Sequence, residues 1–157
     1  RQRTTIAKRD FTMSETTPIL IGYDGTDASD RAVQFAANRA SAEGCPVHVI
    51  HVLEWSPYSF LSTKELEERH QRRTEELSRA EATIAPALRV FTDRNIPVTS
   101  EVRYGHSGEL MCQIATEKKA TQIVIGRKGG TALGARLMGS LALTLVQASP
   151  VPVTVVP

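Results

Sequence analysis

Residues 122–140 read QIVIGRKGGTALGARLMGS. This stretch predicts a buried strand, then a glycine-rich loop, and then the start of a helix. Gln122 to Ile125 form a short, continuous apolar run, which is typical of a strand buried on both faces of a parallel sheet. From about Gly139 or Ser140 to Ala148, apolar residues recur at helical spacing. A strand, a loop and a helix in this order indicate an α/β protein.

The same alternation extends over most of the chain. Four further apolar runs are predicted to be strands: Pro18–Tyr23, Val47–Leu53, Val98–Tyr104 and Val151–Val156. Helices are predicted at about 28–43, ending at Gly44, at about 63–95, and from a start that Ser107 can cap. Pro86 is expected to kink or divide the second of these helices. This order predicts an α/β fold, an open doubly wound parallel sheet of five strands with helices on both faces.

The positive net charge of the chain comes from its first residues. The formal net charge is +2, but residues 1–12 hold four basic residues against Asp10, a charge of +3 that leaves −1 for the remainder. The predicted folded domain, residues 18–157, therefore lacks the basic excess that attracts polyanions, and no nucleic-acid binding is expected. A chain of 157 residues suits a single domain.

Residues 1–17 are predicted to be a flexible extension of that domain. Met13 begins MSETTP just before the first predicted strand, so we interpret it as the natural start and residues 1–12 as added by expression or by upstream read-through. The extension lacks the apolar core of a secretory signal, and no apolar run approaches the ~20 residues of a membrane span. We expect a cytoplasmic protein in which Cys45 and Cys112 are reduced thiols.

The segment from Gly126 to Ser140 is the strongest candidate for a binding site. Backbone N–H groups of a glycine-rich loop, together with the unpaired N–H groups of a first helical turn, can converge on an anion. Glycine at 126, 129 and 139 removes side chains that would hold a phosphate away, and Arg127 and Lys128 add cationic donors. The alternative is a glycine-rich surface loop without a ligand. The spacing matches neither G-x-x-x-x-G-K-[ST] nor G-x-G-x-x-G, which argues against motor-type NTPases and dinucleotide dehydrogenases.

The spacing of these glycines resembles a known nucleotide motif. Gly126-x-x-Gly129, nine further residues and then Gly139-Ser140 are similar to the G-x-x-G-x(9)-G-[ST] motif of the ATP-binding universal stress proteins. The segments IGYDGTDASDRAV, HVIHV, IVIGRKG and PVPVTVV also resemble that family's strands, and the resemblance spans roughly residues 18–157. Tyr23 departs from the pattern, since a smaller aliphatic residue is commoner there.

The resemblance implies a Rossmann-like sheet of strand order 3-2-1-4-5. This order reverses between the first and the fourth strand, and the resemblance assigns nucleotide-binding roles to residues at that reversal, the switch point of the sheet. Asp24 would lie beside the ribose and a Mg²⁺ ion carried by ATP. Val52 would line the adenine pocket. The sugar and phosphates would contact Ile125, Gly126, Lys128, Gly129, Gly139, Ser140 and the backbone N–H of Leu141. It also implies a homodimer formed through the strand Val151–Val156.

Two functions remain open from these residues. The first is an ATP-binding regulatory module of the stress response, which would act on an unidentified protein partner. The second is a slow ATP hydrolase or phosphotransferase that uses the same site. Phosphoryl transfer needs a positioned base, for which only Asp24 and His106 are candidates. The first function is therefore favoured.

Other polar and aromatic residues are weaker candidates. His48 and His51 lie on one predicted strand and point to opposite faces, so they are not expected to share a metal ion. Trp55, Tyr58 and Phe60 lie in a predicted loop, where they either cover the adenine or pack locally.

Overall fold

The fold is an open parallel sheet with helices on both faces, described here from a computed structural model. The structure describes residues 17–54, 62–128 and 139–157. The strands are β1 (Ile19–Gly22), β2 (Val47–Leu53), β3 (Val98–Tyr104), β4 (Gln122–Gly126) and β5 (Val153–Val156). The helices are α1 (Asp27–Glu43), α2 (Thr63–Asp93), α3 (Ser107–Glu117) and α4 (Ser140–Ala148). All neighbouring strands pair in parallel in the order β3-β2-β1-β4-β5, which confirms the predicted sheet.

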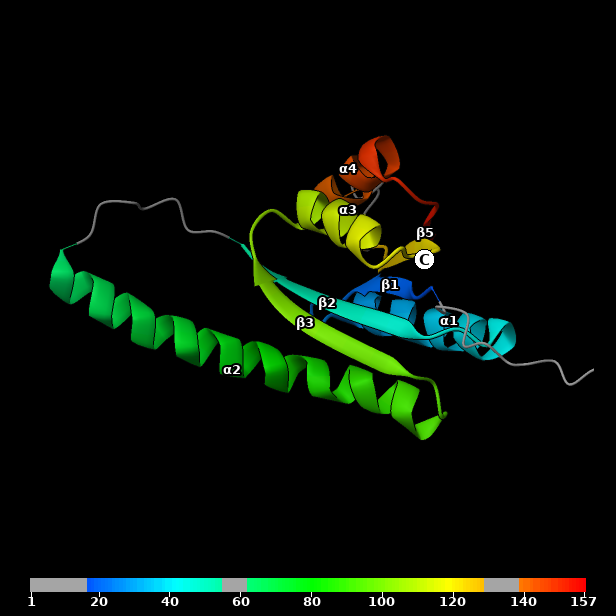
Figure 1. Ribbon diagram of the computed structural model, residues 1–157, viewed down its shortest axis with the longest axis horizontal. Helices are drawn as coiled ribbons and strands as arrows, with labels where there is room; N and C mark the ends of the chain where they lie inside the picture. Colours follow the sequence, from blue (N-terminus) through cyan, green and yellow to red (C-terminus); the bar gives the residue numbers. More distant parts are fainter. Residues whose placement is uncertain (1–16, 55–61, 129–138) are drawn as a thin grey trace, which may run out of the picture.

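Two apolar layers bury the two faces of the sheet. On one face, α1 and α2 pack side chains such as Val33, Ile84 and Phe91 against β1 and β2. On the other face, α3 and α4 pack Ile114 and Leu145 against β1 and β4. Figure 1 shows α3 and α4 on one side of the sheet and α2 on the opposite side. The central strands are therefore covered on both faces, as their continuous apolar runs predicted.

Several element ends differ from the prediction. The first and last strands are shorter than the apolar runs Pro18–Tyr23 and Val151–Val156 suggested. Of the two effects predicted for Pro86, a kink or a division, the division is wrong, because helix α2 continues without a break through this residue. The N-cap of α3 is His106, and Ser107 is already the first helical residue, so the predicted Ser107 cap is wrong as well.

Helix α1 begins and ends at clear local signals. The Thr26 side chain accepts a hydrogen bond from the backbone N–H of Ser29, which satisfies one of the unpaired donors of the first turn. At the other end Gly44 adopts a left-handed φ of 65° and donates its N–H to Ala40, as predicted for this glycine. These caps fix both ends of α1, which starts after a short connection, residues 23–26, from the carboxyl end of β1.

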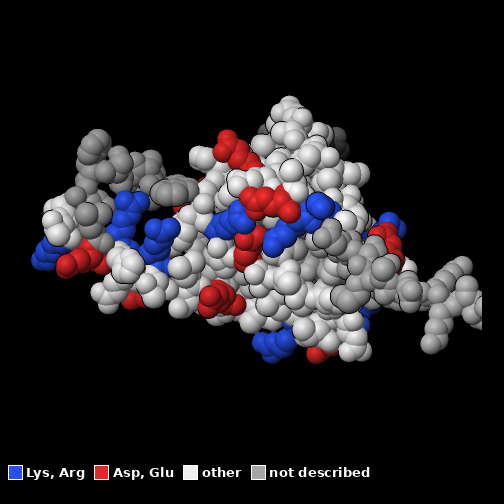
Figure 2. Space-filling view, viewed as in Figure 1, with Lys and Arg blue, Asp and Glu red and all other residues white. Residues whose placement is uncertain are grey.

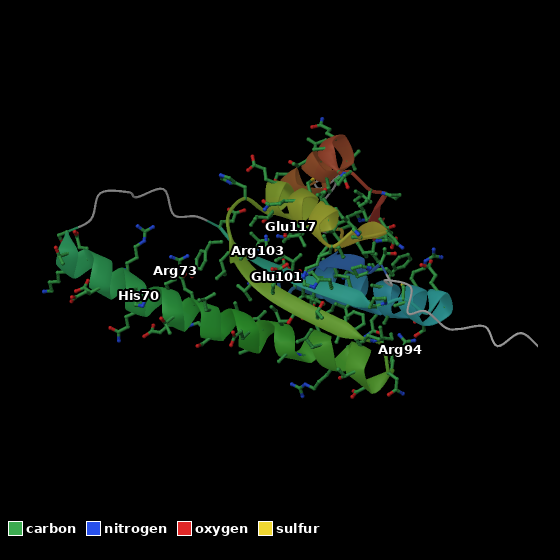
Figure 3. The ribbon with its side chains drawn as sticks, viewed as in Figure 1. His70, Arg73, Arg94, Glu101, Arg103 and Glu117 are labelled. Atoms are coloured by element: carbon green, nitrogen blue, oxygen red, sulfur yellow. The ribbon has the colours of Figure 1, made fainter. Side chains whose placement is uncertain are left out.

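The exposed edge strand β3 carries a chain of polar contacts. The Arg103 guanidinium lies 2.8 Å from a Glu101 carboxylate oxygen and 3.0 Å from one of Glu117 on α3, and Figure 3 shows these three side chains together. The other Glu101 oxygen lies 2.8 Å from Nε2 of the buried His48. Figure 2 shows acidic and basic side chains interspersed on this face, without a large patch of one sign.

Helix α2 reaches well past the end of the sheet, as Figure 1 shows. Its outer part begins with a capping box, in which Ser62 and Glu65 each satisfy a backbone N–H of the other. Its first described buried side chain is Ala80, so the buried stripe of the helix lies in its second half. Across the described ranges, none of the helices combines the length and apolarity that a membrane crossing requires.

Candidate functional site

A pocket of about 420 Å³ opens at the carboxyl ends of β1, β2 and β4. The strand order reverses between β1 and β4, and ligands of doubly wound proteins bind in the crevice at such a point. Among the residues predicted for the site, the pocket lining includes Asp24, Val52, Ile125, Gly126, Lys128, Ser140 and Leu141. Gly139 immediately precedes this lining on the chain, and Gly129 lies outside the described residues. The aromatic residues Trp55, Tyr58 and Phe60 also lie outside them.

Three helices begin at the rim of this pocket. Residues from the first turns of α1, α3 and α4 line it, so the positive ends of three helix dipoles face the same space. Helix α1 is capped by Thr26 and carries Asp27 and Asp30 in its first turn. No side-chain cap is found for α3 or α4 among the described residues, but α3 carries Glu109 in its first turn, whereas the first turn of α4 contains no acidic residue. The start of α4 is therefore the part of the rim best suited to a negatively charged group.

The Asp24 carboxylate is held in place by its neighbours. One of its oxygens accepts hydrogen bonds from the backbone N–H of Thr26, at 3.1 Å, and from the Thr26 hydroxyl. The other oxygen lies 3.1 Å from Nζ of Lys128. Partial burial alone would raise the pKa of Asp24, but the hydrogen bonds from Thr26, Lys128 and Ser29 outweigh it and lower the pKa to about 2. Asp24 is therefore a fixed negative charge at neutral pH.

Tyr23, the residue before Asp24, forms hydrogen bonds with α1 and β2. Its hydroxyl donates to a carboxylate oxygen of Asp30 at 2.7 Å, and Nδ1 of His51 lies 2.6 Å from its carbonyl oxygen. Burial raises the pKa of Tyr23 to about 12, and Asp30 adds to the shift. Tyr23, which is part of the pocket lining, thus connects the end of β1 to β2 and α1.

The two glycines that flank the loop differ in what the fold requires of them. A Cβ at Gly126 would lie 1.9 Å from the carbonyl oxygen of Ala28 in α1, so the protein itself excludes a side chain there. A Cβ at Gly139 would meet no described atom within 4 Å, and its φ of −56° suits any residue. The sequence assigned both glycines to phosphate approach, and the structure adds a packing role for Gly126.

The histidines occupy separate environments. His106 lines the pocket as the N-cap of α3. His48 contacts Thr99 and Glu101 on one face of the sheet, whereas His51 contacts Tyr23 on the other, so the two do not meet, as predicted. In the described parts of the chain, no group of three or more His, Cys, Asp and Glu residues is arranged to hold a metal ion.

Sequence reasoning missed several residues of the lining. Thr26 and Ser29 enter from the start of α1, Thr144 from α4, and Met111 from α3. Thr26 was recognisable, because a threonine between a strand and a helical stripe is a typical N-cap. Met111 carried no such signal, since its helical spacing indicated only a core position.

The strand order, the reversal between β1 and β4 and the pocket outside their carboxyl ends define a doubly wound α/β domain with a ligand crevice at its switch point. Within this class the sequence is specific. Residues 15–157 match the universal stress protein family, and the chain belongs to that family.

Individual relatives agree with this assignment. The chain is 34% identical over 139 residues to a universal stress protein of Thermus aquaticus, covering 88% of this chain and 96% of that protein. A universal stress protein of Mycolicibacterium smegmatis is 29% identical over 143 residues. That match covers 88% of this chain but only 47% of the longer relative. The chain thus corresponds to about half of such relatives.

Solved structures of the family share the fold. A universal stress protein from Archaeoglobus fulgidus has a TM-score of 0.68 at 22% identity, covering 90% of this chain and 98% of that one. The A. fulgidus protein in complex with dAMP has a TM-score of 0.65 at 21% identity, covering 92% and 100%. A universal stress protein in complex with cAMP has a TM-score of 0.66 at 21% identity, covering 92% and 98%.

Proposed function

We propose that this chain binds ATP in the pocket at the switch point and acts as a nucleotide-dependent regulatory module of the stress response. The observation that carries the proposal is the convergence of Asp24, Gly126 and the start of α4 on one pocket. The solved relatives in complex with dAMP and cAMP support an adenine nucleotide as the ligand class. The spacing of Gly126, Gly129, Gly139 and Ser140 supports ATP in particular.

The pocket offers each part of a nucleotide a suitable environment. Ile50, Val52 and Met111 form apolar lining at the end of β2 and the side of α3, which suits a base. The ionised Asp24 accepts hydrogen bonds, which suits the ribose hydroxyls. The N–H groups of Ser140 and Leu141 in the first turn of α4 suit the phosphates.

Wild-type protein is expected to retain ATP through purification, and Gly139→Ala is expected to weaken ATP binding about tenfold, because a methyl group would keep the phosphates from the α4 amides. Isothermal titration calorimetry and mass spectrometry of denatured extracts measure these results. Leu143→Ala is the matched control, since Leu143 lies on the same helix, is 48% exposed and does not line the pocket.

Each outcome of this experiment has a distinct meaning. Absence of ATP binding by the wild type would contradict the proposal itself. Equal affinity of Gly139→Ala and wild type would contradict the placement of the phosphates. Bound ADP in the extract, or phosphate release well above that of Gly139→Ala, would instead favour a slow ATP hydrolase with the same pocket.

The same proposal includes a homodimer formed through the C-terminal strand. Within the described residues β5 pairs only with β4, and its residues Val153–Val156 are half-buried. An open, apolar edge of this kind favours pairing with another chain. We expect sedimentation equilibrium at micromolar concentrations to give twice the chain mass of 17.2 kDa. A monomer under these conditions would contradict the dimer and leave the nucleotide proposal standing.

A further inference from the structure

The charge that faces Asp24 comes from the protein itself. Nζ of Lys128 lies 3.1 Å from one Asp24 oxygen, while the other oxygen accepts two hydrogen bonds from Thr26. One oxygen therefore has both of its acceptor positions filled, and the other is paired with Lys128 and keeps one position open to a ribose hydroxyl. Lys128 is the second residue after β4, so the end of this strand places its ammonium group at the pocket rim.

A Mg²⁺ ion does not fit this arrangement. Mg²⁺ requires near-octahedral oxygen ligands at about 2.0–2.1 Å, and in nucleotide sites it takes one or two carboxylates together with phosphates and water. At Asp24 the position next to the carboxylate is taken by an ammonium group, which repels a second cation. The other carboxylate of the described lining, Glu54, follows β2 rather than β1 or β4.

We propose, as an extension of the ATP site proposed above, that Lys128 takes the place of a divalent cation and that the pocket binds the nucleotide without metal. The ammonium group has three N–H donors, so it can contact Asp24 and the nucleotide phosphates at the same time. Asp24 then acts on the phosphates indirectly by holding Lys128 over the pocket. The ligand is free ATP, in which the phosphates contact Lys128 and the start of α4.

The exposure of the pair is consistent with a role in binding. The Lys128 side chain is 73% exposed and that of Asp24 is 39% exposed. Exposed ion pairs contribute little to the stability of the fold, because solvent screens them. Replacing Lys128 should therefore leave folding intact, which allows a clean test.

The experiment is a calorimetric titration with ATP at fixed ionic strength, once with EDTA and once with excess Mg²⁺. For the wild type, the two dissociation constants should agree within about threefold, because Mg²⁺ adds no contact to the protein. Lys128→Met should weaken binding in EDTA about tenfold or more, which corresponds to the loss of a charge-assisted hydrogen bond. Excess Mg²⁺ should restore part of this loss, because the Asp24 oxygen is then accessible to the ion.

Arg127→Met is the matched control. It removes the same charge one residue earlier, from an exposed side chain that is not part of the pocket lining. It should change the affinity equally with EDTA and with Mg²⁺. Urea unfolding of all three proteins should give the same midpoint, which excludes a folding defect as the cause.

The results separate this inference from the proposal on which it rests. Wild-type affinity that falls tenfold or more in EDTA would overturn the role of Lys128 while confirming an ATP site. An unchanged metal-free affinity in Lys128→Met would overturn it as well. Absence of ATP binding by the wild type in both buffers would overturn the ATP site itself.

Discussion

Replacing Gly126 with alanine is expected to lower the free energy of unfolding by about 3 kcal/mol, at the upper end of the usual cost of overpacking. The added Cβ would lie 1.9 Å from the carbonyl oxygen and 2.2 Å from the carbonyl carbon of Ala28. Neither backbone can easily move away. Gly126 lies in register with Val156, and only residues 23–26 separate β1 from α1. Urea denaturation followed by circular dichroism measures the loss.

Gly139→Ala is the control for this substitution. It adds the same methyl group to the other end of the loop, where no described atom lies within 4 Å of the new Cβ. Its unfolding midpoint should match that of the wild type. If the two variants were equally stable, the contact between β4 and the start of α1 would not be what requires glycine at 126.

The second large effect is expected for Phe91→Ala, which should lower the free energy of unfolding by about 3–5 kcal/mol. Phe91 has 0% exposure and is the largest fully buried side chain of the described chain. It packs with Ile84 and Ile96 in the layer that attaches α2 to the sheet, and its removal leaves a cavity that rigid neighbours cannot fill. The measurement is again urea denaturation.

Leu143→Ala is the comparison for Phe91→Ala. Leu143 is 48% exposed on the outer side of α4, so its truncation should change the stability by less than about 0.5 kcal/mol. A small effect of Phe91→Ala would mean that α2 is not required for the stability of the sheet.

Most of the fold could be predicted because its strands are apolar runs. Ile123, Val124 and Ile125 are at most 4% exposed. Their continuous apolar run therefore correctly predicted a strand that is buried on both faces. The division of α2 at Pro86 was wrongly predicted, because packing outweighs the local cost of a proline in this helix. A proline inside a helix costs about 3 kcal/mol, but the neighbouring Ile84 and Ala87 are buried against the sheet and hold the helix together.

The exact start of α3 could not be predicted for a different reason. Whether His106 or Ser107 is the N-cap depends on the backbone angles, and His106 has the extended ones. A sequence seldom shows which of two neighbouring residues is the N-cap, so predicted helix ends can differ from the observed ones by a residue or two.

The site was predictable at the level of strand ends but not of side-chain pairs. Asp24 follows β1 by two residues and Gly126 ends the neighbouring parallel strand β4, which predicts that they lie at one edge of the sheet. The ion pair between Asp24 and Lys128 was not predictable, since two exposed side chains far apart in sequence meet only through the path of the backbone after β4. The close approach of Gly126 to Ala28 could not be predicted either, because it also depends on how the folded backbone brings distant residues together.

The length of α2 divides this helix into two parts of unequal local stability. The inner part, from Ala80 onward, carries the side chains that are buried against the sheet, so we expect it to open only when the domain unfolds. The outer turns are held by their capping box and by Tyr104 at the end of β3, which contacts Glu76 at 2.8 Å and Arg73 at 4.7 Å from its ring. Figure 3 shows Arg73 on this part. These turns can therefore unfold locally and exchange their amide protons with solvent while the sheet stays folded and the pocket stays intact.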